Sequence, residues 1–234
     1  MFKNDNKINK AKISKNEIFE KSIALFSDEG IDNVTMRDLA SACQLSPGAF
    51  YYHFKNKDDL ILYFYKKSLD GHLSRGVSYL KTAPKDLSIV MKWICHDRFK
   101  EFEQYKTMLE PMASKIDLKS PRSFMSKESY QIRKESVTFF SKVASQCLGI
   151  NNELASIVGR ALWLHHLLIL STWLRDTEGD QKGVLLLSES IRVWKWIPLF
   201  LKIPGSKKMI HKMTNSLKRI GFWAVSYTHL RAHE

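Results

Sequence analysis

Four helix-start signals crowd the first 60 residues, and they constrain the fold more than any other feature of the sequence. Each places a Ser, Thr or Asn side chain where it can cap a helix, and three also place an acidic residue three positions later. Pro47 follows one of the caps at the first helical position, where its missing N–H is harmless. The spacing predicts short helices joined by tight turns. The caps are Ser14, Thr35, Ser46 and Asn56, and the acidic partners are Glu17, Asp38 and Asp59.

The rest of the chain has the pattern of longer helices. Apolar residues recur at spacings of three and four, and only 10 glycines and 6 prolines occur in 234 residues. We therefore predict an all-α fold, with an N-terminal three-helix helix-turn-helix domain joined by a long helix to a larger helical domain. The predicted parts are a flexible basic arm at 1–13, the helix-turn-helix domain at 14–60, the larger domain at 61–222 and a disordered or foreign tail at 223–234.

Each predicted helix ends near a Gly, Pro or Asn that interrupts the apolar pattern. The first runs from Ser14 to Gly30, and the fourth runs from Asn56 to about Lys81. The others cover about 36–43, 47–54, 84–101, 104–114, 122–148, 152–176, 181–201 and 206–220.

The short helix at 47–54 has one apolar side and one side rich in polar-tipped rings. At 100° per residue, Phe50 and Phe54 share a side with Pro47, which we expect to pack on the two preceding helices. Tyr51 and Tyr52 point the other way, behind a slim N-terminal turn. A slim turn can approach base edges in a major groove, while phenol hydroxyls can bind phosphate oxygens. This helix is therefore predicted to touch DNA.

The segment "VTMRDLASACQLSPGAFYYHFKNKDDLI" (34–61) resembles the DNA-binding domain of the TetR/AcrR family of bacterial transcriptional repressors. The resemblance covers about residues 14–62. It departs from the family at Gln44, where a turn glycine is usual and a left-handed backbone would strain glutamine. The resemblance implies phosphate or backbone contacts by some residues and approach to bases by others. The implied DNA-binding residues are Thr35, Arg37, Ser46, Pro47, Gly48, Ala49, Tyr51, Tyr52, His53 and Lys57.

The same resemblance implies a ligand pocket and a dimer interface in the larger domain. The helices at 152–176 and 181–201 are apolar enough to be buried on several sides, in the domain core or against a second copy of the chain. A homodimer would present two recognition helices to a palindromic operator in double-stranded DNA. The predicted effector is an apolar small molecule. Candidate ligand-binding residues are Trp93, His96, Phe99, Phe102, Tyr105, Met108, Met112 and Trp163.

Composition and charge add exclusions rather than a positive identification. The net charge of +13 lies mostly at the C-terminal end, because residues 182–234 hold ten Lys/Arg and two Asp/Glu whereas residues 1–60 hold nine of each. The three cysteines are widely separated, which predicts free thiols and no metal site. No catalytic motif is present, so no enzymatic activity and no cofactor are expected. The apolar run at 161–174 is too short for a membrane span, and a cytoplasmic protein is predicted.

Two other functions fit the sequence less directly. The larger domain could have a filled core, in which case the protein would be a DNA-binding factor that needs no ligand. The basic amphipathic segment at 207–223 could instead bind an anionic membrane surface, although a packed final helix with outward lysines is simpler.

Overall fold

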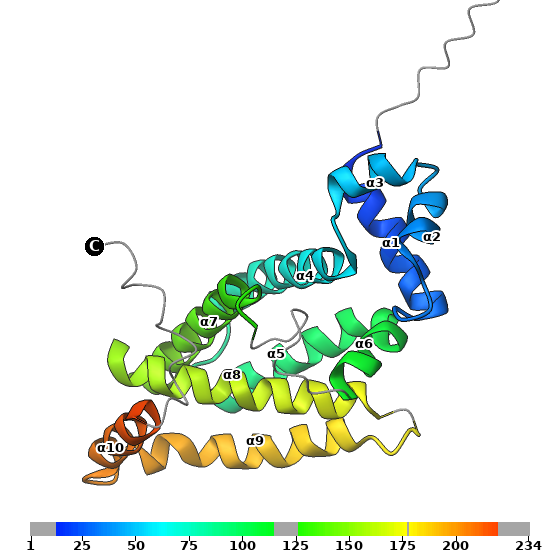
Figure 1. Ribbon diagram of the computed structural model, residues 1–234. Helices are drawn as coiled ribbons and strands as arrows, with labels where there is room; N and C mark the ends of the chain where they lie inside the picture. The colour runs from blue at the N-terminus through cyan, green and yellow to red at the C-terminus, as the bar shows by residue number, and fades with distance from the viewer. Residues whose placement is uncertain (1–12, 115–125, 177, 220–234) are drawn as a thin grey trace, which may run out of the picture. The chain divides into compact units, whose positions relative to one another are not determined.

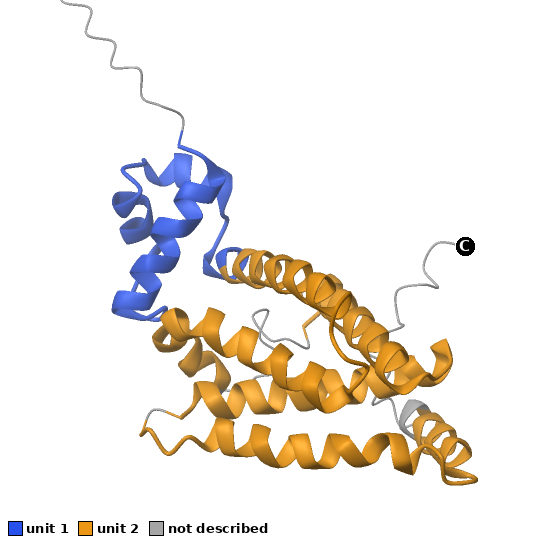
Figure 2. Cartoon of the chain, turned by 180° about the vertical axis from the view of Figure 1, so that it is seen from behind, with its two compact units in different colours: residues 1–60 blue, residues 61–234 orange. Residues whose placement is uncertain are grey.

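The computed structural model describes residues 13–114, 126–176 and 178–219, and the predicted tail and all of the predicted arm except Ile13 lie outside these ranges. Every regular element among the described residues is helical, and the all-α prediction is confirmed (Figure 1). The chain divides into two compact units, residues 1–60 and residues 61–234 (Figure 2).

The first unit is a three-helix cluster followed by the start of a long helix. Its helices are α1 (Lys15–Glu29), α2 (Met36–Ala42) and α3 (Pro47–His53), and α4 (Lys57–Leu80) begins at its end. All four predicted caps form: Ser14, Thr35 and Ser46 accept backbone amides of α1, α2 and α3, and Asn56 accepts the Asp59 amide. The core of this unit consists of buried apolar side chains of the three helices, among them Ile18, Phe26, Leu39, Phe50 and Phe54.

The second unit contains the remaining length of α4 and the later helices. These are α5 (Leu87–Phe102), the 3-10 turn η1 (Glu103–Tyr105), α6 (Lys106–Ser114), α7 (Tyr130–Leu148), α8 (Asn152–Leu174), α9 (Lys182–Phe200) and α10 (Ser206–Arg219). Helix α8 packs against α7, α9, α6 and α5 and so forms the centre of the unit. Two glycines permit its close approach to neighbours. A Cβ on Gly159 would lie 2.5 Å from the backbone nitrogen of Ser141 in α7, and one on Gly183 would lie 2.3 Å from Cβ of Trp173.

Three predicted boundaries or properties need correction. The helix predicted at 122–148 begins at Tyr130, because Ser126–Ser129 form a turn in which the Ser129 amide donates to Oγ of Ser126. The helix predicted from residue 84 begins at Leu87, because Asp86 caps it. The apolar run at 161–174 belongs to a helix of 23 residues, which among the described helices has the length and composition of a membrane span. Its packing within the unit is that of a core helix.

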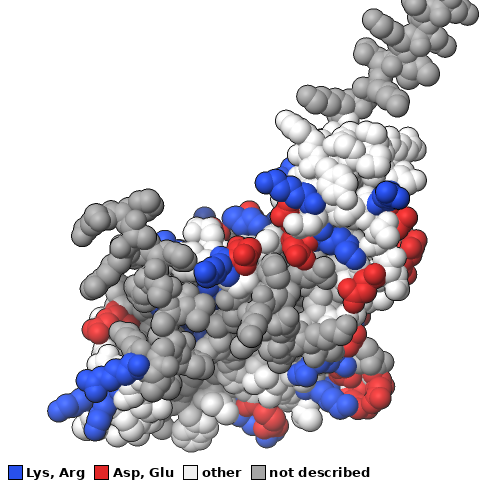
Figure 3. Space-filling model, in the orientation of Figure 1, with Lys and Arg blue, Asp and Glu red and all other residues white. Residues whose placement is uncertain are grey.

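The C-terminal helix α10 packs on α8 through one face, where Thr214 is buried. Lys207, Lys208 and Lys212 are exposed on it, as the sequence predicted for a packed final helix. Blue Lys and Arg side chains are visible at the lower left of Figure 3, the region in which Figure 1 shows α10.

Candidate DNA-recognition helix and ligand cavity

Helix α3 separates its aromatic side chains as the helical wheel predicts. Phe50 and Phe54 are 0% and 1% exposed, and their ring centroids lie 6.3 Å apart. Tyr51 is 46% exposed and Tyr52 is 86% exposed, so both rings face solvent. The predicted division between packed phenylalanines and outward tyrosines is therefore confirmed. Pro47 does not follow it, since this ring is exposed rather than packed.

The first turn of α3 is open on its outer side. Oγ of Ser46 accepts the Ala49 amide at 3.3 Å, which fixes the helix start. Gly48 and Ala49 are exposed, and a Cβ added to Gly48 would meet no atom within 4 Å. The structure thus brings the residues predicted to approach bases together on one exposed turn. His53 follows at the end of α3, edge-on to Tyr52 at 5.2 Å between ring centroids.

The turn between α2 and α3 keeps a left-handed residue without glycine. Gln44 has φ +57°. Its backbone amide donates to the carbonyl oxygen of Ser41 at 2.8 Å, and the Leu45 amide donates to the carbonyl oxygen of Ala40 at 2.9 Å. The left-handed conformation costs a non-glycine residue about 1 kcal/mol or more. Gln44 thus adopts the left-handed conformation that the sequence analysis associates with strain in glutamine.

Thr35 and Arg37 are exposed at the start of α2, but the Thr35 hydroxyl is already engaged. Its Oγ1 donates to Oδ2 of Asp38 at 2.7 Å and accepts the Asp38 amide at 3.2 Å. The hydrogen bonds from Thr35 hold the pKa of Asp38 below its ordinary value. To donate to a phosphate, the Thr35 hydroxyl would have to give up its hydrogen bond to Asp38. The sequence alone did not indicate this competition.

Lys57 has a structural role that sequence reasoning missed. Its ammonium donates to the carbonyl oxygens of Ile31 at 2.7 Å and Val34 at 3.0 Å. Two of its three N–H donors thereby fasten the start of α4 to the connection between α1 and α2. One donor remains for the phosphate contact that the family resemblance implies.

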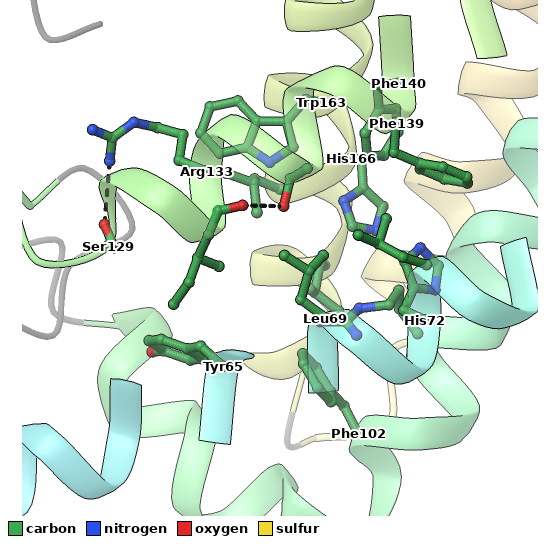
Figure 4. A pocket seen from close by; sticks show the side chains of 16 residues that line it. Tyr65, Leu69, His72, Phe102, Ser129, Arg133, Phe139, Phe140, Trp163 and His166 are labelled. Atoms are coloured by element: carbon green, nitrogen blue, oxygen red, sulfur yellow. Dashed lines mark hydrogen bonds between the residues drawn. The ribbon is translucent and has the colours of Figure 1, made fainter. Parts of the chain in front are cut away.

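A cavity of about 50 Å³ lies in the second unit. It is enclosed by α4, α5, α7 and α8, and its walls combine aromatic rings with basic side chains (Figure 4). Among the residues around it are Tyr65, Leu69, His72, Arg98, Phe102, Ser129, Arg133, Phe139, Phe140, Trp163 and His166.

Of the eight predicted ligand-binding residues, only Phe102 and Trp163 line this cavity. The other six are not among the residues that line it, and most of them contact residues outside the predicted set. Trp93 stacks on Tyr79 at 4.3 Å and Phe99 on Trp173 at 4.7 Å between centroids. His96 is exposed, Tyr105 lies edge-on to Phe64, Met108 is fully buried, and Met112 contacts the Tyr65 hydroxyl through sulfur.

Two polar residues that line the cavity, His72 and Arg98, belong to a network of ion pairs and hydrogen bonds that extends behind its wall. Nη1 of Arg98 donates to Oγ of Ser68 at 2.8 Å and to Oε2 of Glu101 at 3.2 Å. Nδ1 of His72 lies 2.7 Å from Oδ2 of Asp97, which also accepts from Arg75. Burial lowers the pKa of Arg98 to about 10, so the guanidinium still carries its charge at neutral pH. Burial alone would raise the pKa of Asp97, but its bonds to His72 and Arg75 hold that pKa well below the usual range.

His166 is the most unusual side chain at the cavity. It is buried, and neither ring nitrogen has a hydrogen-bond partner among the described residues. Burial, reinforced by the charges of His72 and Arg98, holds its pKa well below the ordinary value, so the ring is neutral. An unsatisfied buried N–H costs about 1–3 kcal/mol, and such a group in a cavity indicates a site that a bound molecule can complete.

Comparison with known proteins identifies the N-terminal part. A family model described as "Bacterial regulatory proteins, tetR family" matches residues 18–64. The transcriptional regulator YerO of Bacillus subtilis is 30% identical over 100 residues, covering 41% of this chain and 33% of YerO. IcaR of Staphylococcus epidermidis, a negative transcriptional regulator of a biofilm operon, is 29% identical over 66 residues, covering 28% of this chain and 34% of IcaR. The segment at 18–64 is therefore that of the TetR family.

The matched segments span about a third of the length of these curated relatives, both of which are named as transcriptional regulators. Solved TetR-family structures share the fold over most of the chain. A putative regulator from Syntrophomonas wolfei superposes with TM-score 0.62 at 17% identity, covering 81% of this chain and 97% of its own. FadR of Thermus thermophilus, solved with lauroyl-CoA, superposes with TM-score 0.61 at 18% identity, covering 77% of this chain and 93% of its own.

The basic residues of the cavity escaped prediction, although the sequence carries a signal for them. On α5 the buried positions Met91, Ile94, Cys95 and Phe102 are spaced by three, four and seven residues, and Arg98 falls on the same stripe. A charged residue on a buried helical stripe is rare and marks either a paired structural ion or a binding site. His166 falls in the same way on the buried stripe of α8.

Proposed function

We propose that this TetR-family regulator is a dimeric repressor that leaves its operator when a small molecule occupies the cavity of the second unit. The observation that carries the proposal is the course of α4. At its start, Lys57 is bonded to the loop between α1 and α2. Further along the same helix, Tyr65, Leu69 and His72 line the cavity. A ligand that displaces these side chains would therefore act on a helix that also holds the DNA-binding unit.

The repressor mechanism requires that the ligand prefer one state of the protein. A ligand shifts an equilibrium only by its difference in affinity between the two states. We propose that the occupied cavity tilts α4 and changes the spacing of the two recognition helices of a dimer. FadR of Thermus thermophilus, solved with lauroyl-CoA, is a repressor of the same fold whose structure holds a ligand, which supports the presence of a ligand site in a repressor of this fold.

The exposed apolar side chains of α8 and α9 support a homodimer. Leu168, Leu185, Val193, Trp196 and Leu199 are each more than half exposed, an unusual density for the surface of two neighbouring helices. Two such helices from each copy would form a four-helix interface. A Trp196→Lys variant should sediment as a monomer and lose affinity for a two-half-site operator. A dimer that survives this change with its affinity intact contradicts the assignment.

The DNA-binding role is tested by selection from a random DNA pool. A dimer of this kind should recover a palindromic site whose half-sites are separated by about one helical turn or a multiple of it. Purified operator should then be released by the effector. Recovery of sites without symmetry would contradict the dimeric mechanism while leaving DNA binding in place.

One observation favours a regulator that needs no ligand. The cavity has a volume of about 50 Å³, far smaller than the 300–1,000 Å³ of typical ligand sites. If operator affinity stays constant in the presence of every compound that binds the protein, the ligand-independent function replaces the proposed one. We place either regulator in the cytoplasm, where its operator DNA would be.

A further inference from the structure

We infer that the cavity binds a small neutral alcohol or phenol, whose hydroxyl group joins His72 of α4 to His166 of α8. The inference names the ligand class of the site in the proposed function and rests on that function. The two imidazole rings line the cavity side by side, with centroids 6.4 Å apart and planes 12° from parallel (Figure 4). Both side chains are buried, at 3% and 6% exposed. Nε2 of His72 and both ring nitrogens of His166 have no hydrogen-bond partner among the described residues.

His72 needs a hydrogen-bond donor at Nε2. Its Nδ1 lies 2.7 Å from Oδ2 of Asp97. Although burial opposes the effect, the bonds to His72 and Arg75 hold the pKa of Asp97 well below its usual range, so this carboxylate can only accept. Nδ1 of His72 therefore carries the proton of the ring. Burial lowers the pKa of His72, which leaves the ring uncharged at neutral pH and leaves Nε2 with a lone pair.

His166 needs both a donor and an acceptor. Burial, reinforced by the charges of His72 and Arg98, holds its pKa well below the ordinary value, so one ring nitrogen carries a proton and the other a lone pair. A hydroxyl oxygen can accept the N–H of His166 while its own proton is donated to Nε2 of His72. Two hydrogen bonds of about 2.8 Å at one oxygen join nitrogens up to about 5.6 Å apart, which is comparable with the 6.4 Å between the ring centroids.

The same count of donors and acceptors disfavours other ligand classes. A carboxylate or an ether only accepts, so it leaves Nε2 of His72 without a donor. An ammonium ion only donates, so it leaves the N–H of His166 unpaired, and its charge loses hydration in a buried site. A water molecule has the required groups, but only an alcohol also buries carbon against the apolar wall of Leu69, Phe102 and Trp163.

The size of the cavity limits the carbon part of the ligand. The cavity has a volume of about 50 Å³, whereas a cavity of about 150 Å³ holds a benzene ring. A short alcohol therefore fits with little rearrangement, and a ring fits only if side chains such as Leu69 of α4 move aside. Such a movement is the displacement on α4 that the proposed function requires.

The test uses two pairs of isomers, 1-butanol with diethyl ether and benzyl alcohol with anisole. The members of a pair contain the same atoms, but only the alcohol can donate a hydrogen bond. Titration of the full chain without DNA, followed by NMR of isotope-labelled histidines, measures affinity and reports hydrogen bonding at the two rings. Each alcohol should bind at least about tenfold more tightly than its ether, the effect expected when buried hydrogen-bonding groups lose a partner. Benzoate and benzylammonium should bind more weakly than benzyl alcohol.

Three results would overturn the inference. The first is an ether that binds as tightly as its alcohol, and the second is no binding by either alcohol. The third is tighter binding of benzoate or benzylammonium than of benzyl alcohol.

Variants identify the residues that recognise the hydroxyl group. His166→Phe removes the unpartnered nitrogens at similar volume, and His72→Asn keeps an amide that can donate to Asp97 but has no atom at Nε2. Each variant should lose the preference for alcohol over ether while still binding the ether. His96→Phe is the matched control and should keep the preference, because His96 is exposed and is not among the lining residues. An unchanged preference in both cavity variants would refute the assignment to these two histidines.

A second measurement separates this inference from the proposed function. Release of operator DNA is followed by fluorescence anisotropy with the same probes. Alcohols that bind with the expected preference but do not release DNA would support the ligand class and refute the repressor mechanism. Release by the ethers and not by the alcohols would support the mechanism and refute the ligand class.

Discussion

Replacing Gly48 by Ala should separate folding stability from DNA binding. Gly48 is at the second position of α3, and the added Cβ would meet no protein atom within 4 Å. The methyl group therefore adds no clash inside the chain. Glycine in a helix costs about 0.5–1 kcal/mol relative to alanine, so the variant should be up to about 1 kcal/mol more stable. For a chain of this length the corresponding rise in Tm is about 2–4 °C or less.

Operator affinity should change in the opposite direction. In the proposed complex the first turn of α3 approaches base edges, and a methyl group there would hold the helix away from them. Loss of one well-formed base contact costs about 1–3 kcal/mol, which is about 5- to 150-fold in Kd. Thermal unfolding of the free protein and fluorescence anisotropy with a selected operator measure the two quantities separately.

Gly71→Ala in α4 is the matched control. The nearest atom to its added Cβ is Nη1 of Arg75 at 3.1 Å, whereas the hydrogen bonds of Arg75 to Asp97 and Glu101 run from Nε and Nη2. This variant should gain similar stability and keep its operator affinity. If Gly48→Ala binds the operator as tightly as the parent, the assignment of this turn to the base edges is wrong. If it loses stability, the reasoning about free space at Gly48 is wrong.

The remaining predictions concern strain, bracing, packing and pH. Gln44→Gly should raise the free energy of unfolding by about 0.5–1 kcal/mol in urea titrations, because it relieves a left-handed glutamine; no gain would show that the turn is unstrained. Lys57→Met should lower the free energy of unfolding by about 1.5–3 kcal/mol, because two charge-assisted hydrogen bonds are lost. Unchanged stability together with a shallower salt dependence of DNA binding would favour a phosphate contact instead. Gly159→Ala should cost about 1–2 kcal/mol in the same titration, because its Cβ overlaps the backbone of α7 by more than the helix propensity recovers. His166 stays neutral in the fold but is protonated below about pH 6.5 when unfolded, so stability should fall as the pH drops below that value, and less in His166→Phe.

The helices of the first unit could be predicted from the sequence because their signals are local. A cap such as Thr35 acts on amides three residues away, and the two faces of α3 depend only on the order of residues within one helix. The same locality explains the error at the start of α7. Ser126 and Ser129 can cap each other in a turn as well as start a helix, and only the packing of neighbouring segments decides between the two.

The cavity could not be predicted in the same way, because no single helix contains it. Phe102 and Trp163 were predicted as ligand-binding residues and do line the cavity. Trp93 and Phe99 were predicted on the same grounds and lie on the same helix as Phe102, but they form stacked pairs with other rings. Aromatic content therefore does not distinguish core from pocket.

A charged or polar residue on a buried stripe distinguishes them better. Arg98 and His166 occupy such positions on α5 and α8. Each needs a hydrogen-bond partner, either within the protein or from a bound molecule or water. Arg98 found Glu101 and Ser68, as an ion held for structural reasons would. His166 found none among the described residues, and replacing it with a ring of equal size would leave the core filled. The buried ring nitrogens of His166 therefore differ from the guanidinium of Arg98, because they could be satisfied only by a bound molecule or an ordered water.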